Sequence, residues 1–175
     1  MKGNLLRFVR ARAHFARANE AKIVRSSNAQ FKTRESPIRF VFQIRGRRHL
    51  IFASDQQLQV LSKSKSWYVD ATFKLCRHPF SQLWTVNAFV KNDDHVKQVP
   101  LVFVIMSGKK KRDYKSVLEA LLSILPYQPR VKKVTLDFEK AMWSAVRQVL
   151  PDTELMGCSF HWTQALWRKV STMID

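Results

Sequence analysis

Apolar positions between residues 38 and 65 first follow the two-residue period of β-strands and then the longer period of a helix. Two alternating runs are separated by a turn at Gly46, which predicts a two-stranded hairpin over residues 38–53. A short helix is expected next, with Ser54 or Asp55 as its N-terminal cap, because either side chain can accept a hydrogen bond from a free backbone amide.

Three further apolar runs predict strands at residues 66–73, 83–91 and 98–106, and their short connections predict an antiparallel meander. Beyond them, apolar residues recur three or four positions apart, which is the spacing of helices. The helical patterns cover 113–125, 142–150 and 162–174, with strands expected between them at 131–137 and 154–160. The order from residue 66, βββαβαβα, predicts an α/β (mixed α+β) fold with a mixed sheet of about five strands and flanking helices.

The 175 residues are enough for one medium domain with a short appendage. A formal net charge of +18 and a pI near 10.5 indicate a polyanionic partner, nucleic acid before anionic membrane. The longest apolar run is too short to cross a bilayer, so no membrane partner is expected. We expect a basic N-terminal helix and linker at 1–37, a hairpin and short helix at 38–65, and the main domain at 66–175.

The N-terminal segment predicts an amphipathic basic helix over residues 4–20. Four arginines interleave with its apolar residues: Arg7, Arg10, Arg12 and Arg17. Such a helix can lie along a phosphate backbone, or it can be a solvated helix without a fixed partner, and the sequence leaves both open. Because the first 19 residues are Arg-rich and acid-free, a mitochondrial presequence is a rival interpretation.

Two carboxylates at the ends of predicted strands are the first candidates for chemistry. Asp70 ends the apolar run in SWYVDATF, and Asp137 ends the run in VTLDF. A carboxylate is costly to bury unless it is paired or binds a cation, and carboxylates suit hard ions such as Mg²⁺ or Mn²⁺. On spacing alone a structural role is favoured, in which each Asp ends a strand or pairs with a neighbouring lysine.

A cysteine and a histidine three residues apart, Cys158 and His161 in GCSFHW, can form half of a zinc site. Cys76 and His78 are the other half on paper, but C-x-H is not a common half-site. A buried cysteine and a hydrogen-bonded histidine are therefore favoured, and zinc is not expected as a cofactor.

A cationic run and the tryptophans are the remaining candidates for contact with nucleic acid. The run consists of Lys109, Lys110, Lys111 and Arg112. It can contact phosphate groups or act as a nuclear import signal, with a solvated turn as the default. The five tryptophans can stack on bases, but they lie in apolar faces, so we expect most of them in the core.

Taken in order, these segments resemble the MULE (Mutator-like element) transposases. The resemblance rests on WYVDATF, QLWTVNAFV, VPLVFVIMSG, VTLDFEKAMWSAVRQVLP and GCSFHWTQALWRKV, and it covers about residues 38–170. Each piece is weak alone, whereas the ordered set of D-A-T-F, L-D-F-E-K-A and G-C-x-F-H-W-x-Q-x-L-W is specific. The resemblance implies a ribonuclease-H-like fold, in which the first and fourth strands lie side by side and bring their acids together.

By this resemblance, Asp70 and Asp137 are the first two acids of a catalytic D-D-E triad that binds Mg²⁺ or Mn²⁺. Cys158 and His161 match the family's C-x-x-H element, with an implied supporting role at the active site. The implied reaction is hydrolysis of a DNA strand at a transposon end, followed by attack of the freed 3′-hydroxyl on target DNA. The implied partner is DNA in the nucleus, without a small-molecule substrate, and a homo-oligomer stays open.

The sequence departs from the family pattern at the third acid. The family's catalytic Glu lies on a helix well beyond the C-x-x-H, and no acid of this sequence matches it, so we expect little or no nuclease activity from this polypeptide alone. A Cys/His-rich N-terminal zinc module is not matched either, and we expect a truncated domain. Two functions follow: a partial catalytic domain of a MULE transposase, or a non-catalytic DNA-binding protein derived from one.

Overall fold

The computed structural model describes residues 24–26, 38–44, 47–73, 76–92 and 94–172. The predicted basic helix at the N-terminus lies outside these residues, and with it the four arginines Arg7, Arg10, Arg12 and Arg17. Within the described part of the chain, no helix is long and apolar enough to cross a membrane.

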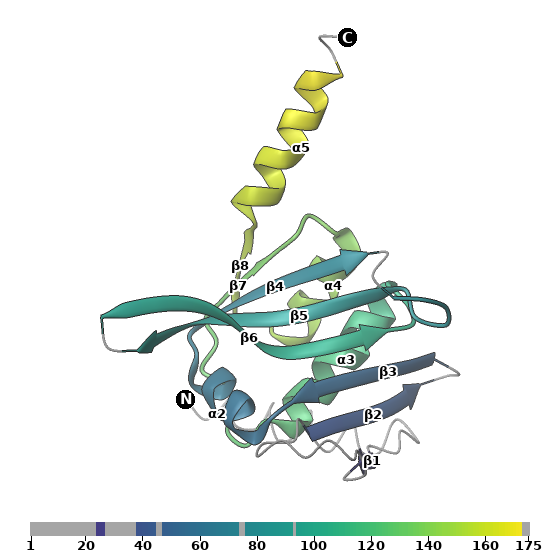
Figure 1. Cartoon of the computed structure of the whole chain (residues 1–175), viewed down its shortest axis with the longest axis vertical. Helices are drawn as coiled ribbons and strands as arrows, with labels where there is room; N and C mark the ends of the chain where they lie inside the picture. The colour runs from purple at the N-terminus through teal and green to yellow at the C-terminus, as the bar shows by residue number, and fades with distance from the viewer. Residues whose placement is uncertain (1–23, 27–37, 45–46, 74–75, 93, 173–175) are drawn as a thin grey trace.

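A single mixed sheet forms the centre of the molecule, with the strands in the order β1-β2-β3-β6-β5-β4-β7-β8 (Figure 1). All neighbouring pairs are antiparallel except β4–β7 and β7–β8, which are parallel. The strands are β1 (Val24–Ser26), β2 (Ile38–Ile44), β3 (Arg47–Ala53), β4 (Ser66–Phe73), β5 (Gln82–Asn92), β6 (His95–Met106), β7 (Lys133–Leu136) and β8 (Glu154–Gly157). The described helices are α2 (Asp55–Lys63), α3 (Lys111–Ile124), α4 (Lys140–Val149) and α5 (Ser159–Ser171).

The predicted α/β fold is confirmed. From β4 onward the elements follow the expected βββαβαβ order, and the first and fourth of these strands, β4 and β7, are parallel neighbours. This arrangement is compatible with a ribonuclease-H-like fold. The sheet is wider than the expected five strands because β3 of the predicted hairpin pairs with β6 and so extends the sheet beyond the meander.

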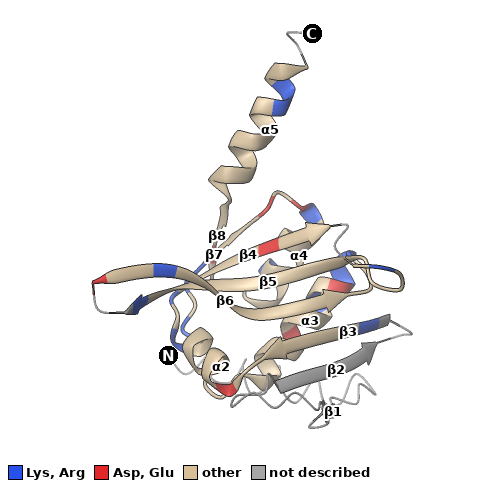
Figure 2. Cartoon of the chain, in the orientation of Figure 1, with Lys and Arg blue, Asp and Glu red and all other residues tan. Residues whose placement is uncertain are grey.

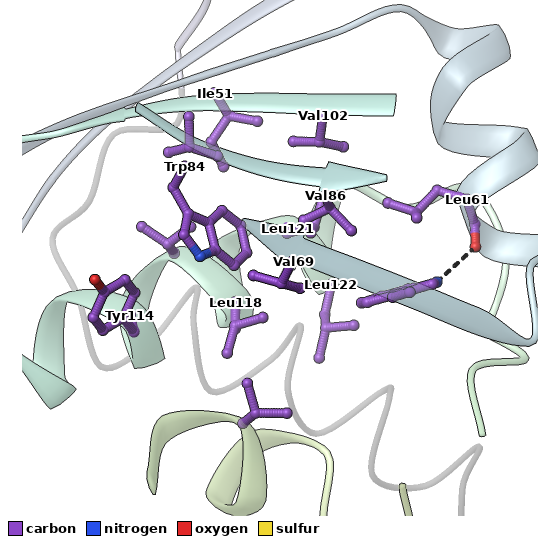
Figure 3. Packing of buried hydrophobic residues seen from close by; sticks show 14 of the residues in the cluster. Ile51, Leu61, Val69, Trp84, Val86, Val102, Tyr114, Leu118, Leu121 and Leu122 are labelled. Atoms are coloured by element: carbon purple, nitrogen blue, oxygen red, sulfur yellow. Dashed lines mark hydrogen bonds between the residues drawn. The ribbon is translucent and has the colours of Figure 1, made fainter. Parts of the chain in front are cut away.

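The core lies between the sheet and the helices α3 and α4, which cover one of its faces (Figure 1). Alternate residues of β4 point into it, since Trp67, Val69 and Ala71 are buried. Figure 3 shows Leu118 and other side chains of α3 packed against side chains of the central strands. The strand period of β4 therefore fixes which residues leave the core, and Asp70 is one of those on the other face.

The short helix α2 begins as predicted, with Ser54 as its N-cap. The Ser54 hydroxyl accepts a hydrogen bond from the Gln57 amide at 3.2 Å, and the Gln57 side chain accepts one from the Ser54 amide at 2.8 Å. This reciprocal pair is a capping box. At the other end of the helix, the Leu61 carbonyl accepts a hydrogen bond from the Trp67 indole, which ties α2 to β4.

Two predictions about the C-terminal segment are wrong. The strand expected at residues 154–160 ends at Gly157, because Cys158 is the N-cap of α5. The last predicted helix was expected to flank the sheet, but no residue of α5 is buried and the helix projects away from the sheet (Figure 1). The expectation that most tryptophans are core residues is confirmed, since Trp67 and Trp84 are buried and Trp143 packs against the core. The two exceptions lie on α5, where Trp162 is 57% exposed and Trp167 is 73% exposed.

Candidate active site

The parallel pairing of β4 with β7 brings the two predicted acids to the same place. Ser66 is opposite Lys133 and Tyr68 is opposite Thr135. Continuing this register by two residues sets Asp70 opposite Asp137, since both pairs are separated by 67 positions. The register of the two strands therefore accounts for the proximity of the two carboxylates, which are far apart in the sequence.

His161 lies between the two carboxylates. Its Nε2 atom is 3.8 Å from Asp70 Oδ1, and its Nδ1 atom contacts Asp137 Oδ1. The histidine reaches this position from the first turn of α5, whose start is attached to β7 by a hydrogen bond of 2.9 Å from the Cys158 amide to the Leu136 carbonyl. Asp70, Asp137, Cys158 and His161, which were singled out from the sequence, thus lie around one end of β7.

The two acids differ in environment. The Asp70 side chain is 48% exposed, whereas that of Asp137 is 16% exposed. Burial raises the pKa of Asp137 above its ordinary value, because a partly desolvated carboxylate resists ionisation. The imidazole of His161 opposes this shift in pKa, whereas the negative charges of Asp70 and Glu139 add to it. The contacts of His161 with both side chains place the two acids in one site.

Asp137, Cys158 and His161 each offer one ligand atom, and these atoms lie within 4.8 Å of one another. Asp137 Oδ1 and His161 Nδ1 are both shielded from solvent, and neither has another hydrogen-bond partner among the described residues. Two adjacent buried ligand atoms without other partners fit a bound cation. Cys76 and His78 are not part of this group. A zinc site that combines them with Cys158 and His161 therefore does not form within the described residues.

A third carboxylate near the acids, Glu139, was missed by the sequence reasoning. Its Oε2 atom accepts a hydrogen bond of 2.7 Å from the hydroxyl of Tyr114, which is fully buried. The Tyr114 hydroxyl in turn accepts a hydrogen bond of 2.9 Å from Gln82 Nε2, also fully buried. The available signal was the position of Glu139, two residues after Asp137. The helical pattern predicted for residues 113–125, which contains Tyr114, gave no sign of the polar partner of this tyrosine.

The amino-acid pattern of this region matches a known family. A family model described as the MULE transposase domain matches residues 66–165, which is more than half of the chain and contains all four site residues named above. The chain belongs to the MULE transposase family. Neither a curated protein nor a solved structure matches it. The family supports a transposase-related function, and transposases of this kind generally use a divalent metal ion.

In this MULE domain Asp137 faces a cavity of about 510 Å³. Its lining includes Asp137, Glu139 and His161 together with two cationic residues, Lys109 and Arg168. Lys109 is therefore the one member of the predicted cationic run that lines the cavity, and its ammonium group lies 5.1 Å from the centre of the Phe73 ring. Lys109 and Arg168 thus lie beside the carboxylates, where they can form charge-assisted hydrogen bonds with a phosphate group.

The rest of the cationic run continues into α3 of the MULE domain. Lys110 is the N-cap of that helix, and its backbone amide donates a hydrogen bond of 2.8 Å to the Asp113 carboxylate. The side chains of Lys110, Lys111 and Arg112 are exposed. Their predicted contact with nucleic acid stays a prediction.

Proposed function

We propose that this chain is a partial catalytic domain of a MULE-type DNA transposase. The complete transposase would cleave and transfer DNA strands with Mg²⁺ or Mn²⁺. The observation that carries the proposal is the register between β4 and β7, which brings Asp70 and Asp137 to one site with His161 between them. The match to the family model supports a transposase-related function.

Asp70 and Asp137 would hold the metal ion, and His161 or Cys158 would complete or support the site. A divalent ion bound there supplies Lewis-acid chemistry, which activates a water or a 3′-hydroxyl and stabilises the leaving oxygen. The chain's own cations, Lys109 and Arg168, line the same cavity and favour the approach of a phosphate group. Glu139, which accepts a hydrogen bond from Tyr114, adds negative charge to the cavity. This charge favours a cation over water at Asp137.

The test is titration of the protein with Mn²⁺, followed by electron paramagnetic resonance or calorimetry. We expect Asp70→Asn and Asp137→Asn each to weaken Mn²⁺ binding at least about tenfold. Substitution of residues that only support metal ligands already lowers metal affinity by about this factor. Asp94→Asn is the matched control, since Asp94 is an exposed acid in the turn between β5 and β6. Binding that both site variants leave unchanged would refute the proposal.

The alternative is a non-catalytic DNA-binding protein derived from a transposase. The net charge of +18 favours it, because such a charge binds DNA without any metal chemistry. Both functions predict DNA binding that weakens with salt. Their dependence on divalent metal ions distinguishes the two functions. DNA binding by the non-catalytic protein would not change with Asp70→Asn or with removal of divalent ions.

Action on DNA implies the nucleus as the working compartment, with the mitochondrial matrix as the alternative. Import of the protein into isolated mitochondria distinguishes them. A presequence would be removed with the first 30 or so residues, whereas a nuclear protein would keep its N-terminus.

A further inference from the structure

A second cavity lies at the other end of β4 and β7 and has no part in the acid site. Its volume is about 910 Å³, and it is lined by the C-terminal end of α2, the loop before β7 and the turn before β8. The charged residues in its lining are four cations and one acid: Lys63, Lys65, Arg130, Lys132 and Asp152. We call this the basic pocket. Figure 2 shows Lys and Arg positions in blue beside the C-terminal end of α2.

Hydrogen bonds between backbone groups hold the walls of the basic pocket in place. The Arg130 amide donates to the Ser62 carbonyl at 2.9 Å, and the Lys132 amide donates to the Lys65 carbonyl at 2.8 Å. The Lys132 carbonyl then accepts a hydrogen bond of 2.8 Å from the amide of Glu154. The cationic side chains therefore extend from a backbone that the sheet already fixes, so that little further order has to be imposed when an anion binds.

The pocket carries an excess of positive charge, because four cations in its lining face a single acid, Asp152. Four cations around one cavity repel one another, and a multivalent anion relieves that repulsion. The pocket also presents Tyr127, which is 53% exposed and has the ammonium group of Lys63 at 6.0 Å from its ring centre. Cations beside an exposed aromatic ring are typical of surfaces that bind nucleic acid.

The position of the pocket relates it to the acids. Lys65 and Lys132 each lie five residues before the acid on the same strand path, Asp70 and Asp137 respectively. At about 3.3 Å per residue, the two sites are about 17 Å apart. This is about half of the 34 Å helical turn of duplex DNA, so one duplex can reach both sites.

We propose that the basic pocket binds backbone phosphate groups of the DNA duplex on which the acid site acts. The proposal rests on the proposed function for the identity of the polyanion. It assigns the phosphate contacts to Lys65, Arg130 and Lys132, and a contact with a sugar or base to Tyr127. The pocket thereby positions the duplex and takes no part in the chemical step.

Photo-crosslinking tests the proposal with the full chain and a DNA duplex carrying a transposon terminal repeat. Benzoylphenylalanine is introduced in place of Tyr127 in the pocket, in place of Phe138 beside the acids, or in place of Phe89 on β5 as a background control. These three side chains are similarly exposed, at 53%, 58% and 50%. We expect crosslinks from positions 127 and 138 that map within one helical turn of each other on the DNA, and only background from position 89.

The outcomes separate the two proposals. A crosslink from 138 without one from 127 would overturn the basic pocket and leave the proposed function standing. A crosslink from 127 alone would support DNA binding in the pocket and count against DNA at the acids. No crosslink above the level of position 89 at either position would overturn both.

Salt dependence gives an independent measurement. We expect the double variant Lys65→Gln/Lys132→Gln to lower the slope of log affinity against log salt by about two, because each lost phosphate contact removes about 0.9. The matched control is Lys91→Gln/Lys97→Gln, which removes the same charge from exposed positions on β5 and β6. A slope that the pocket variant changes no more than the control does would overturn the proposal.

Discussion

Replacement of Tyr114 by Phe tests the buried network that holds Glu139 beside Asp137. The ring of Tyr114 packs in the core between α3 and the sheet (Figure 3), while its hydroxyl bridges two polar side chains. It donates to Glu139 Oε2 at 2.7 Å and accepts from Gln82 Nε2 at 2.9 Å. The substitution removes only the hydroxyl, so that the packing of the ring is kept and the loss reports on the hydrogen bonds.

The expected loss of stability follows from the two partners. A hydrogen bond to a charged acceptor contributes about 1.5–3 kcal/mol, and a neutral one about 0.5–1.5 kcal/mol. Gln82 Nε2 keeps contacts with Gly108 O and Met106 Sδ, both at 3.4 Å, which limits the penalty on its side. We therefore expect Tyr114→Phe to lower the free energy of unfolding by about 2 kcal/mol, which for a chain of this size lowers Tm by about 4–8 °C.

Urea unfolding monitored by circular dichroism measures the change, with Tyr127→Phe as the control because Tyr127 is 53% exposed. The control should stay within about 0.5 kcal/mol of the unmodified protein, as surface substitutions usually do. A loss below about 0.5 kcal/mol for Tyr114→Phe would mean that the hydroxyl contributes no net stability and that Glu139 is held by other contacts.

Burial, followed by the hydrogen bond to Glu139, raises the pKa of Tyr114 well above the ordinary phenol value of 10.0, so the unfolded chain releases this proton first. Stability should therefore fall as pH rises above about 10, and phenolate absorbance should show Tyr114 ionising only together with unfolding. Glu139→Gln should lower the pKa of Asp137, measurable by carboxyl-detected NMR, because a negative neighbour is removed; an unchanged pKa would show that Glu139 does not act on this acid. Leu121→Ala should cost about 2–5 kcal/mol of unfolding free energy, whereas Leu166→Ala on exposed α5 should change it little; equal losses would contradict the assigned burial. The 175-residue polypeptide alone should show little or no Mg²⁺-dependent cleavage of a terminal-repeat duplex, since only two of the three implied acids are matched; robust cleavage that Asp70→Asn abolishes would contradict this.

The order of elements could be predicted because local signals carried it. The alternation in β4 and the helical spacing in α3 and α4 appear directly in the sequence, and the boundaries came out within a few residues. The meeting of Asp70 and Asp137 was different, because strand ends 67 residues apart do not indicate their pairing. It followed from the family resemblance, and the β4–β7 register now gives it a physical basis.

Two features of the site had no local signal. The hydrogen bond from Tyr114 to Glu139 joins residues 25 positions apart, and periodicity alone predicts a side chain's face without its polar partner. The exposure of α5 also escaped prediction. An apolar helix face shows that burial is favourable, but it does not show what the helix packs against, and within the described residues α5 has no buried side chain.

The exposed helix and the acid site are nevertheless linked through a single turn. α5 buries none of its residues, yet its N-cap Cys158 and its third residue His161 reach the acids. The hydrogen bond from the Cys158 amide to Leu136 and the contact between His161 and Asp137 fix the first turn to the end of β7. The remaining turns of α5 have no comparable anchor among the described residues, so the orientation of the helix depends on the same side chain that bridges the carboxylates. We therefore expect a change in the charge of Asp137 to act on the attachment of α5 as well, because the contact with His161 belongs to both.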